Sequence, residues 1–123
     1  EMCIRDRDKL DEISMSAPTT VCEIRDGWFQ SYELTPEQFG YKRCDKAELV
    51  GGAPEENAAI TRAILAGEDR GPRRCAVCLN AGAALYITAR AENMEQGVRL
   101  AEQLIDNSAA RLKLEEFVRE SRA

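Results

Sequence analysis

Two adjacent carboxylates, Asp11 and Glu12, stand between the apolar residues Leu10 and Ile13, just before the turn-rich stretch SMSAPTT. Carboxylate oxygens are the ligands that Mg²⁺ prefers, and the ion is often held by one or two of them together with water and substrate phosphates. An acidic pair is also typical of a solvated loop end. On this pattern alone both interpretations stay open, so Asp11 and Glu12 are candidate metal ligands, and no residue is assigned as a catalytic acid, base or nucleophile.

The chain contains no histidine, and this limits the chemistry that its residues can carry. Neither a Ser–His or Cys–His nucleophile pair nor a zinc site of cysteine and histidine can be formed within it. The five cysteines are an odd number, which favours reduced thiols and a cytoplasmic location. Cys75 and Cys78 form a CxxC, but the stretch around them is apolar on almost every side. We therefore predict that both are buried, reduced core residues.

Two asparagines and a glycine-rich stretch could also contact a ligand. The glycines of VGGAPEEN could bind phosphate through backbone N–H groups, but Glu55 and Glu56 in the first turn of the following helix would repel an anion. We interpret the stretch as a structural cap, with Asn57 bound to a neighbouring loop. Asn80 lies in a buried apolar helix, where an amide must find partners, and a loop backbone is the usual one.

Charge and hydropathy exclude two classes of partner. The net charge is −5, from 17 basic and 22 acidic residues that are interleaved along the chain. No basic stripe is present, so we expect no nucleic-acid partner. No apolar run approaches the roughly 20 residues of a membrane helix, so we expect no membrane partner. The basic pair Lys42 and Arg43 is interpreted as part of a solvated face.

The elements that must position these residues follow from turn and capping signals, and the fold class is α/β. Asp26-Gly27 predicts a hairpin turn between strands over residues 19–34, with aromatic residues such as Trp28 and Phe29 packing against the rest. Thr35 and Asn93 are predicted helix caps. We expect a β-hairpin at the margin of a larger sheet, followed by four to five helices, of which four are placed near residues 54–66, 75–89, 94–106 and 109–121. The last of these is expected to pack through Leu114, Phe117 and Val118.

The first residues, EMCIRDRDK, show neither a capping signal nor an apolar period. We interpret residues 1–9 as a non-natural lead-in that resembles a translated sequencing adapter, and we expect the natural chain to begin upstream. A lone hairpin also needs a sheet or helices to cover its apolar face. Residues 10–123 are therefore expected to be the C-terminal part of a larger α/β domain.

Four stretches in register carry a resemblance to a known family. They are LDEISMSAPTTVCEI, LTPEQFGYKR, GGAPEENAAITRAILAGE and GPRRCAVCLNAGAALYI. In this order and at this spacing they resemble the C-terminal part of the anthranilate phosphoribosyltransferases, over roughly residues 10 to 121. The resemblance implies a small helical domain followed by a larger α/β domain of the nucleoside phosphorylase/phosphoribosyltransferase type.

The resemblance also implies an activity. The family transfers the phosphoribosyl group of phosphoribosyl pyrophosphate to anthranilate in tryptophan biosynthesis, gives N-(5-phosphoribosyl)anthranilate and pyrophosphate, and uses Mg²⁺. Its adjacent Asp-Glu pair binds Mg²⁺ at the pyrophosphate, and this role maps onto Asp11 and Glu12. The phosphate loop, the anthranilate-contacting residues and the helical domain through which the family forms homodimers are expected upstream. No substrate-binding residue is therefore assigned, and we expect the chain by itself to be inactive.

The sequence departs from the family pattern at several positions. RDRDK stands where the family carries a lead-in with His-Gly, and Cys75 and Ala53 stand where the family usually has aspartate, or threonine in the second case. Two alternatives to the resemblance stay open. One is a pyrimidine nucleoside phosphorylase on the same fold, and the other is a non-catalytic helical interaction module that folds as a compact monomer.

Overall fold

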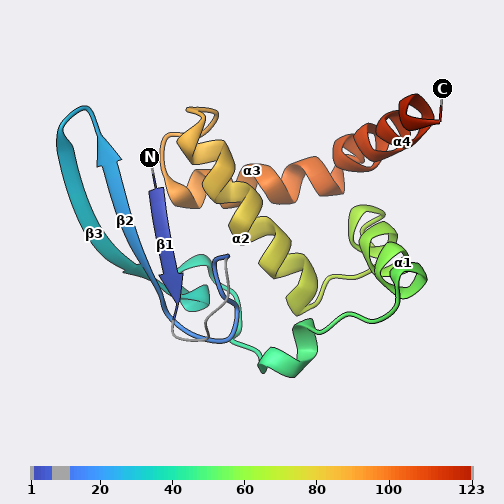
Figure 1. Ribbon diagram of the computed structural model, residues 1–123, viewed down its shortest axis with the longest axis horizontal. Coiled ribbons are helices and arrows are strands. Elements are labelled where there is room, and N and C mark those ends of the chain that lie inside the picture. The colour runs from blue at the N-terminus through green and yellow to red at the C-terminus, as the bar shows by residue number, and fades with distance from the viewer. Residues whose placement is uncertain (1, 7–11, 123) are drawn as a thin grey trace.

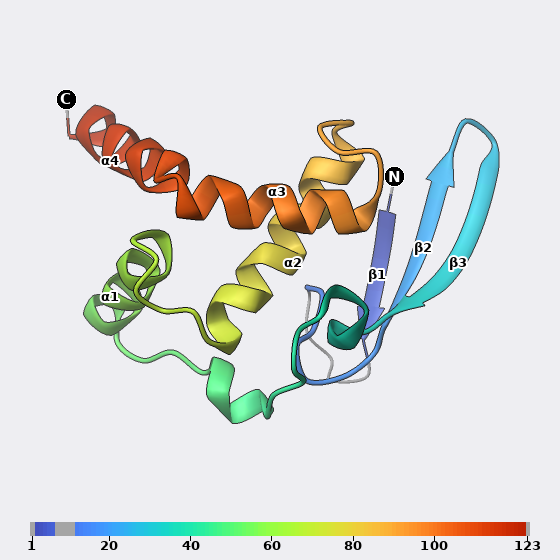
Figure 2. The same ribbon diagram turned by 180° about the vertical axis from the view of Figure 1, so that it is seen from behind.

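The computed structural model describes residues 2–6 and 12–122. A small sheet lies at one end of the molecule, two crossing helices occupy the middle, and two more helices lie at the end away from the sheet (Figure 1, Figure 2). None of the described helices is long and apolar enough to cross a membrane. In chain order the elements are β1 (Met2–Asp6), β2 (Thr19–Arg25), β3 (Trp28–Leu34), the 3₁₀ turns η1 (Pro36–Phe39) and η2 (Lys46–Leu49), α1 (Pro54–Leu65), α2 (Pro72–Ile87), α3 (Met94–Asp106) and α4 (Ala109–Ser121).

The predicted hairpin is confirmed. β2 and β3 pair antiparallel, with Arg25 opposite Trp28 at the turn. Asp26 and Gly27 have φ of 46° and 78°. A two-residue turn with positive φ at both positions has the twist that antiparallel strands need, and glycine and aspartate are among the residues that tolerate it. The hairpin is therefore fixed by local turn chemistry.

A third strand extends the sheet beyond the hairpin. β1 pairs antiparallel with β2, with Met2 opposite Glu23 and Asp6 opposite Thr19, and the strand order is β1-β2-β3. No element had been predicted for residues 1–9, because EMCIRDR has no apolar alternation. β2 is thus the central strand, and Val21 in its middle is fully buried. The interpretation of residues 1–9 as a non-natural lead-in stays a prediction.

The two middle helices, α2 and α3, touch at a pair of glycines. A Cβ built on Gly97 would lie 2.2 Å from the carbonyl oxygen of Gly82, and a Cβ built on Gly82 would lie 2.6 Å from the backbone nitrogen of Val98. Only glycine permits backbones to approach this closely. α2 is therefore held in a fixed position against α3, together with every side chain that it carries.

The core lies where α2 meets α3, the central strand and the loop before that strand. Its largest fully buried apolar side chains come from all four of these parts: Met15, Val21, Leu79 and Val98. At the sheet end of α2, the Tyr86 hydroxyl donates a hydrogen bond to the carboxylate of Glu23 on β2. This bond gives a partner to a carboxylate that is only 6% exposed, and it joins α2 to the sheet.

Helix bounds agree with the predictions to within one residue except at α2. This helix begins at Pro72, three residues before the predicted start, and ends at Ile87 instead of residue 89. Proline suits the first turn of a helix, where its missing N–H costs no hydrogen bond. At the other end Ala89 has a φ of 60°, which is incompatible with a continuing helix. The Asn93 cap of α3 is confirmed, because its Oδ1 accepts from the Gln96 N–H at 2.8 Å.

Several predictions of burial were wrong. Trp28 and Phe29 at the hairpin turn are 49% and 64% exposed, and Phe117 is 69% exposed. α4 contributes no buried residue. α2 is not buried on every side either, since its apolar residues Val77 and Ile87 are 39% and 48% exposed. An apolar side chain is buried only where another element covers it, and a local pattern does not say where that is.

Candidate functional site

The loop after the predicted metal ligands connects Glu12 to β2. Asp11 lies outside the described residues, so the structure places only Glu12 of the pair. Glu12 is exposed, whereas Ile13, Ser14 and Met15 are 3%, 1% and 1% exposed. The chain therefore enters the core directly after the acidic pair, and Glu12 stays at the surface.

Asn80 in the middle of α2 binds this loop through its backbone. Its Oδ1 accepts a hydrogen bond from the Ile13 N–H at 2.8 Å, and its Nδ2 donates to the Ile13 carbonyl at 3.0 Å. Nδ2 also donates to the Ala76 carbonyl one helical turn earlier, at 2.9 Å. The prediction that Asn80 anchors a loop backbone is confirmed, and the loop is the one that carries Glu12.

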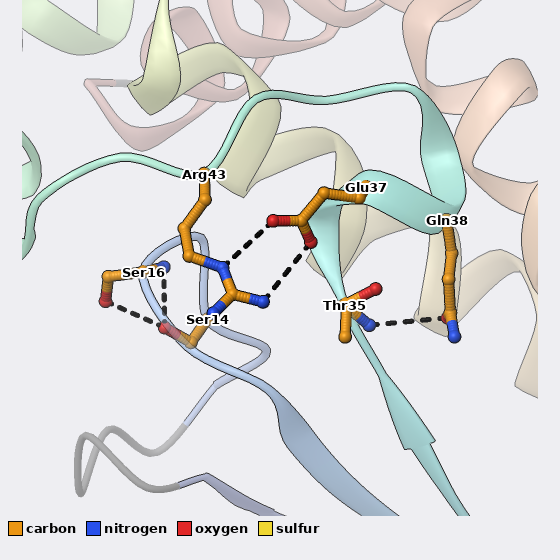
Figure 3. Close-up of polar contacts among 6 residues, drawn as sticks. All are labelled: Ser14, Ser16, Thr35, Glu37, Gln38 and Arg43. Carbon is orange, nitrogen blue, oxygen red and sulfur yellow. Dashed lines mark hydrogen bonds and ion pairs between the residues drawn. The ribbon is translucent and has the colours of Figure 1, made fainter.

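Further hydrogen bonds fix the loop beyond Ile13. The Ser14 N–H donates to the Thr19 hydroxyl at 3.1 Å. The Ser16 N–H donates to the Ser14 hydroxyl at 3.0 Å, as Figure 3 shows. The Cys44 N–H donates to the Met15 carbonyl at 3.1 Å, which joins the loop to the segment after η1. These roles were not predicted from the sequence, although serine and threonine in a turn-rich stretch are a signal for such bonds.

Glu12 borders a cavity of about 500 Å³ that lies between the loop, η2, α1 and α2. The cavity is lined by apolar side chains such as Ile60 and by two basic residues, Lys46 and Arg73. The Arg73 Nη2 donates to the Val50 carbonyl at 2.9 Å. Glu12 thus borders open space in which water and ligand oxygens fit.

The residues described around Glu12 are compatible with Mg²⁺ that is bound together with substrate oxygens. Within residues 2–6 and 12–122, no three cysteine or acidic side chains come together as a metal-binding group. A cation at Glu12 would therefore take its other ligands from Asp11, water and the oxygens of a substrate. Mg²⁺ keeps several waters and is commonly bound in this way, through one or two carboxylates and phosphate oxygens.

Arg43 is engaged by an acidic neighbour. Its Nε donates to one carboxylate oxygen of Glu37 at 3.0 Å and its Nη2 to the other at 3.3 Å (Figure 3). A backbone hydrogen bond, and in addition the Arg43 guanidinium, lower the pKa of the Glu37 carboxyl. Lys42 is exposed. The interpretation of Lys42 and Arg43 as a solvated face is confirmed.

The capping predictions around the site are also met. The Thr35 N–H donates to the Gln38 Oε1 at 3.3 Å, which closes the reciprocal cap of η1. Asn57 binds the loop before α1, as predicted: its Oδ1 accepts from the Gly52 N–H at 2.8 Å and its Nδ2 donates to the Gly52 carbonyl at 3.0 Å. The backbone N–H and C=O of Gly52 are therefore bound by a side chain of the helix that follows the glycine-rich stretch.

The CxxC pair is only partly as predicted. Cys78 is fully buried, whereas Cys75 is half-buried, and both are free thiols. Cys75 lies one turn before Cys78, nearer the start of α2. Burial raises the pKa of both thiols, and the Arg74 guanidinium opposes this in part. The pair has the environment of core residues and not that of a reactive thiolate.

Comparisons with known proteins bear on the loop and on the fold. The model of the glycosyl transferase family, a/b domain, matches residues 2–111. The anthranilate phosphoribosyltransferase of Methanobrevibacter smithii is 54% identical to this chain over 112 residues, which are 91% of this chain and 33% of that protein. The chain thus spans about a third of the length of the curated relatives that it matches.

Solved structures agree with these sequence matches. The anthranilate phosphoribosyltransferase of Thermus thermophilus is similar with a TM-score of 0.89 and 38% identity, over 99% of this chain and 36% of that one. The Saccharomyces cerevisiae enzyme, solved in complex with PRPP and Mg, is similar with a TM-score of 0.84 and 26% identity, over 94% of this chain and 33% of that one. The likeness extends over nearly the whole of this chain.

Proposed function

Since the chain belongs to the glycosyl transferase family through its a/b domain, we propose that it carries the Mg²⁺-binding loop of an anthranilate phosphoribosyltransferase. The full-length protein transfers the phosphoribosyl group of phosphoribosyl pyrophosphate to anthranilate and releases pyrophosphate, in tryptophan biosynthesis. The observation that carries this proposal is the 54% identity to the Methanobrevibacter smithii enzyme. The yeast relative bound to PRPP and Mg supports the same ligands for this chain.

In this proposal Asp11 and Glu12 hold the ion through their carboxylates and do not transfer a proton. Bound Mg²⁺ supplies positive charge where the leaving pyrophosphate gains negative charge. The work of the chain is to keep these ligands in place before substrate arrives, because preorganised charge at the reacting centre is usually the largest catalytic contribution. The exposed Glu12 on a loop held at Ile13 fits that task. The open space beside it leaves room for the substrate's phosphates.

A chimaera tests the proposal. In it, this chain replaces the matching third of the Methanobrevibacter smithii enzyme, and anthranilate consumption is followed by fluorescence with phosphoribosyl pyrophosphate and Mg²⁺. We expect transfer that depends on Mg²⁺. In the double variant Asp11→Asn, Glu12→Gln, the size of the side chains is kept and their charge removed, so the half-saturating Mg²⁺ concentration should rise and turnover should fall, while the thermal unfolding temperature changes little. An inactive chimaera, or full activity at low Mg²⁺ in the double variant, contradicts the proposal.

Two further parts of the proposal concern the whole protein. We place it in the cytoplasm, and the free thiols of Cys22, Cys44, Cys75 and Cys78 fit a reducing compartment. We also propose that it forms a homodimer through the helical domain that precedes the α/β domain in the family. Size-exclusion chromatography with light scattering on the full-length protein with its own upstream domain measures this directly, and a monomer at micromolar concentration would contradict it.

A further inference from the structure

We propose that Asn80 is a positioning residue for the metal: it fixes the backbone of Ile13, and through it the peptide plane from which the Glu12 side chain extends. This inference rests on the proposed function, because it assumes that the acidic pair binds Mg²⁺. It adds a residue that lies 67 positions further along the chain and that does not touch the ion itself.

The hydrogen bonds to Ile13 act on Glu12 through the planar peptide bond. The Ile13 N–H, which Asn80 Oδ1 accepts at 2.8 Å, belongs to the same peptide unit as the Glu12 carbonyl. Because that unit is planar, fixing the N–H fixes the plane that contains the Glu12 Cα. The second bond, from Nδ2 to the Ile13 carbonyl at 3.0 Å, prevents rotation about the first. The Glu12 Cα is thereby held in place, although the residue itself is exposed.

Only an amide at position 80 can make these bonds together. Oδ1 accepts one N–H, and the two N–H groups of Nδ2 meet two carbonyls, those of Ile13 and Ala76. A carboxylate at this position would place a second oxygen against those carbonyls. An apolar residue would leave the N–H and C=O of Ile13, a residue only 3% exposed, without these partners.

The two elements that bond the loop, α2 through Asn80 and β2 through Thr19, are each packed in the core. Asn80 lies between the fully buried Leu79 and the Gly82 backbone contact with α3. On the other side Thr19, at the start of the central strand and fully buried, accepts from the Ser14 N–H. Ligands that are already ordered bind a metal without the entropy cost of ordering a loop, and outer partners of this kind commonly change metal affinity about 10- to 100-fold.

The test measures metal affinity separately from turnover, in the chimaera described above. Mn²⁺ takes the same oxygen ligands as Mg²⁺, and its free concentration is read by electron paramagnetic resonance in the presence of phosphoribosyl pyrophosphate. For Asn80→Ala we expect the dissociation constant of Mn²⁺ to rise about tenfold or more. The half-saturating Mg²⁺ concentration in the transfer assay should rise by a similar factor, and turnover should recover at high Mg²⁺.

Two further variants separate positioning from stability. Asn80→Gln keeps a hydrogen-bonding amide but moves it by one methylene, so the chimaera should fold while metal affinity still falls. Ile105→Ala removes a buried apolar side chain of α3 that has no bond to the loop, so the thermal unfolding temperature should fall without a change in Mn²⁺ affinity. If metal affinity is lowered equally in Ile105→Ala, or not at all in Asn80→Gln, Asn80 has only a structural role and the inference is wrong.

Failure of this inference and failure of the proposed function give different results. An unsubstituted chimaera without Mg²⁺-dependent transfer contradicts the function. An active, Mg²⁺-dependent chimaera in which Asn80→Ala folds and binds Mn²⁺ with unchanged affinity contradicts the role of Asn80 alone.

Discussion

Within one turn, α2 carries Asn80, which hydrogen-bonds the neighbouring loop, and Cys78 and Leu79, which are fully buried. Asn80 uses its amide to hold the loop, while Cys78, two residues earlier and on nearly the opposite side of the helix, has no exposed surface. Burial raises the pKa of the Cys78 and Cys75 thiols above their ordinary value of 9.0, because the thiolate would lose hydration in the core. At this scale, chemistry is decided by which side of the helix a residue faces.

We therefore predict slow and ordered thiol labelling in the folded chimaera at pH 8. Cys78 should react more slowly than Cys75, and both should react more slowly than in the urea-unfolded protein, because the thiolate is the reactive form and burial disfavours it. The rates are measured by quenching an alkylating reagent at intervals and quantifying the modified peptides by mass spectrometry. Equal rates for Cys78 in the folded and unfolded states would refute the prediction.

The raised thiol pKa values also predict a direction for stability against pH. The folded pKa of each thiol lies above the unfolded value of 9.0, so the unfolded chain loses its protons first. The stability that they contribute is present below about pH 9 and is lost as the pH rises through the folded pKa. Urea unfolding from pH 7 to pH 10.5 measures this, with a Cys78→Ala, Cys75→Ala variant as the control whose stability should decline less above pH 9.

At the scale of elements, the contact between α2 and α3 holds the helix that carries Asn80. Gly97→Ala would place a Cβ 2.2 Å from the Gly82 carbonyl, so the helices must move apart. We expect a loss of unfolding free energy of about 1–3 kcal/mol, as for other overpacked cores. The matched change Asn93→Ala, which removes the N-cap of α3 but leaves the interface intact, should cost about 1 kcal/mol.

Urea unfolding of the chimaera compares the two variants. Gly97→Ala should also raise the half-saturating Mg²⁺ concentration, because it displaces the helix that carries Asn80, whereas Asn93→Ala should not. A Gly97→Ala protein as stable as the parent would show that α2 and α3 do not need this close approach.

Local signals are what made parts of the fold predictable from sequence. The Asp26-Gly27 turn and the Asn93 cap each act within a few residues, so their geometry follows from the residues themselves. The start of α2 was missed although Pro72 is such a signal, because the apolar run was taken as its boundary. β1 has no local signal, since its pairing with β2 spans the loop between them.

The candidate site could be predicted only in part for the same reason. The acidic pair and the loop-binding role of Asn80 follow from residue types and from the rule that buried amides are hydrogen-bonded. The partner of Asn80 does not, because Ile13 lies 67 residues away. The exposure of Phe117 was likewise missed, because burial depends on what other elements cover and not on the pattern within α4.

At the scale of the whole molecule, the exposed apolar side chains are spread over several elements. Phe29 on the hairpin, Val50 before α1 and Phe117 on α4 are 64%, 63% and 69% exposed. A cavity of about 740 Å³ between α1 and α4 is lined by apolar side chains such as Leu65 and Leu114. Apolar surface that is exposed to water, such as the lining of this cavity, promotes association between copies of the chain.

We predict that the 123-residue chain, expressed by itself, catalyses no phosphoribosyl transfer and binds Mg²⁺ weakly at most. Two carboxylates hold a strongly hydrated ion poorly unless substrate phosphates complete its coordination, and the phosphate loop that the resemblance implies is expected upstream of this chain. The exposed apolar residues should cause the chain to self-associate as its concentration rises. Isothermal titration with Mg²⁺, the fluorescence assay and light scattering measure these three properties. Transfer by the chain alone would refute the prediction, and a monomer at high micromolar concentration would support instead an independently folded interaction module.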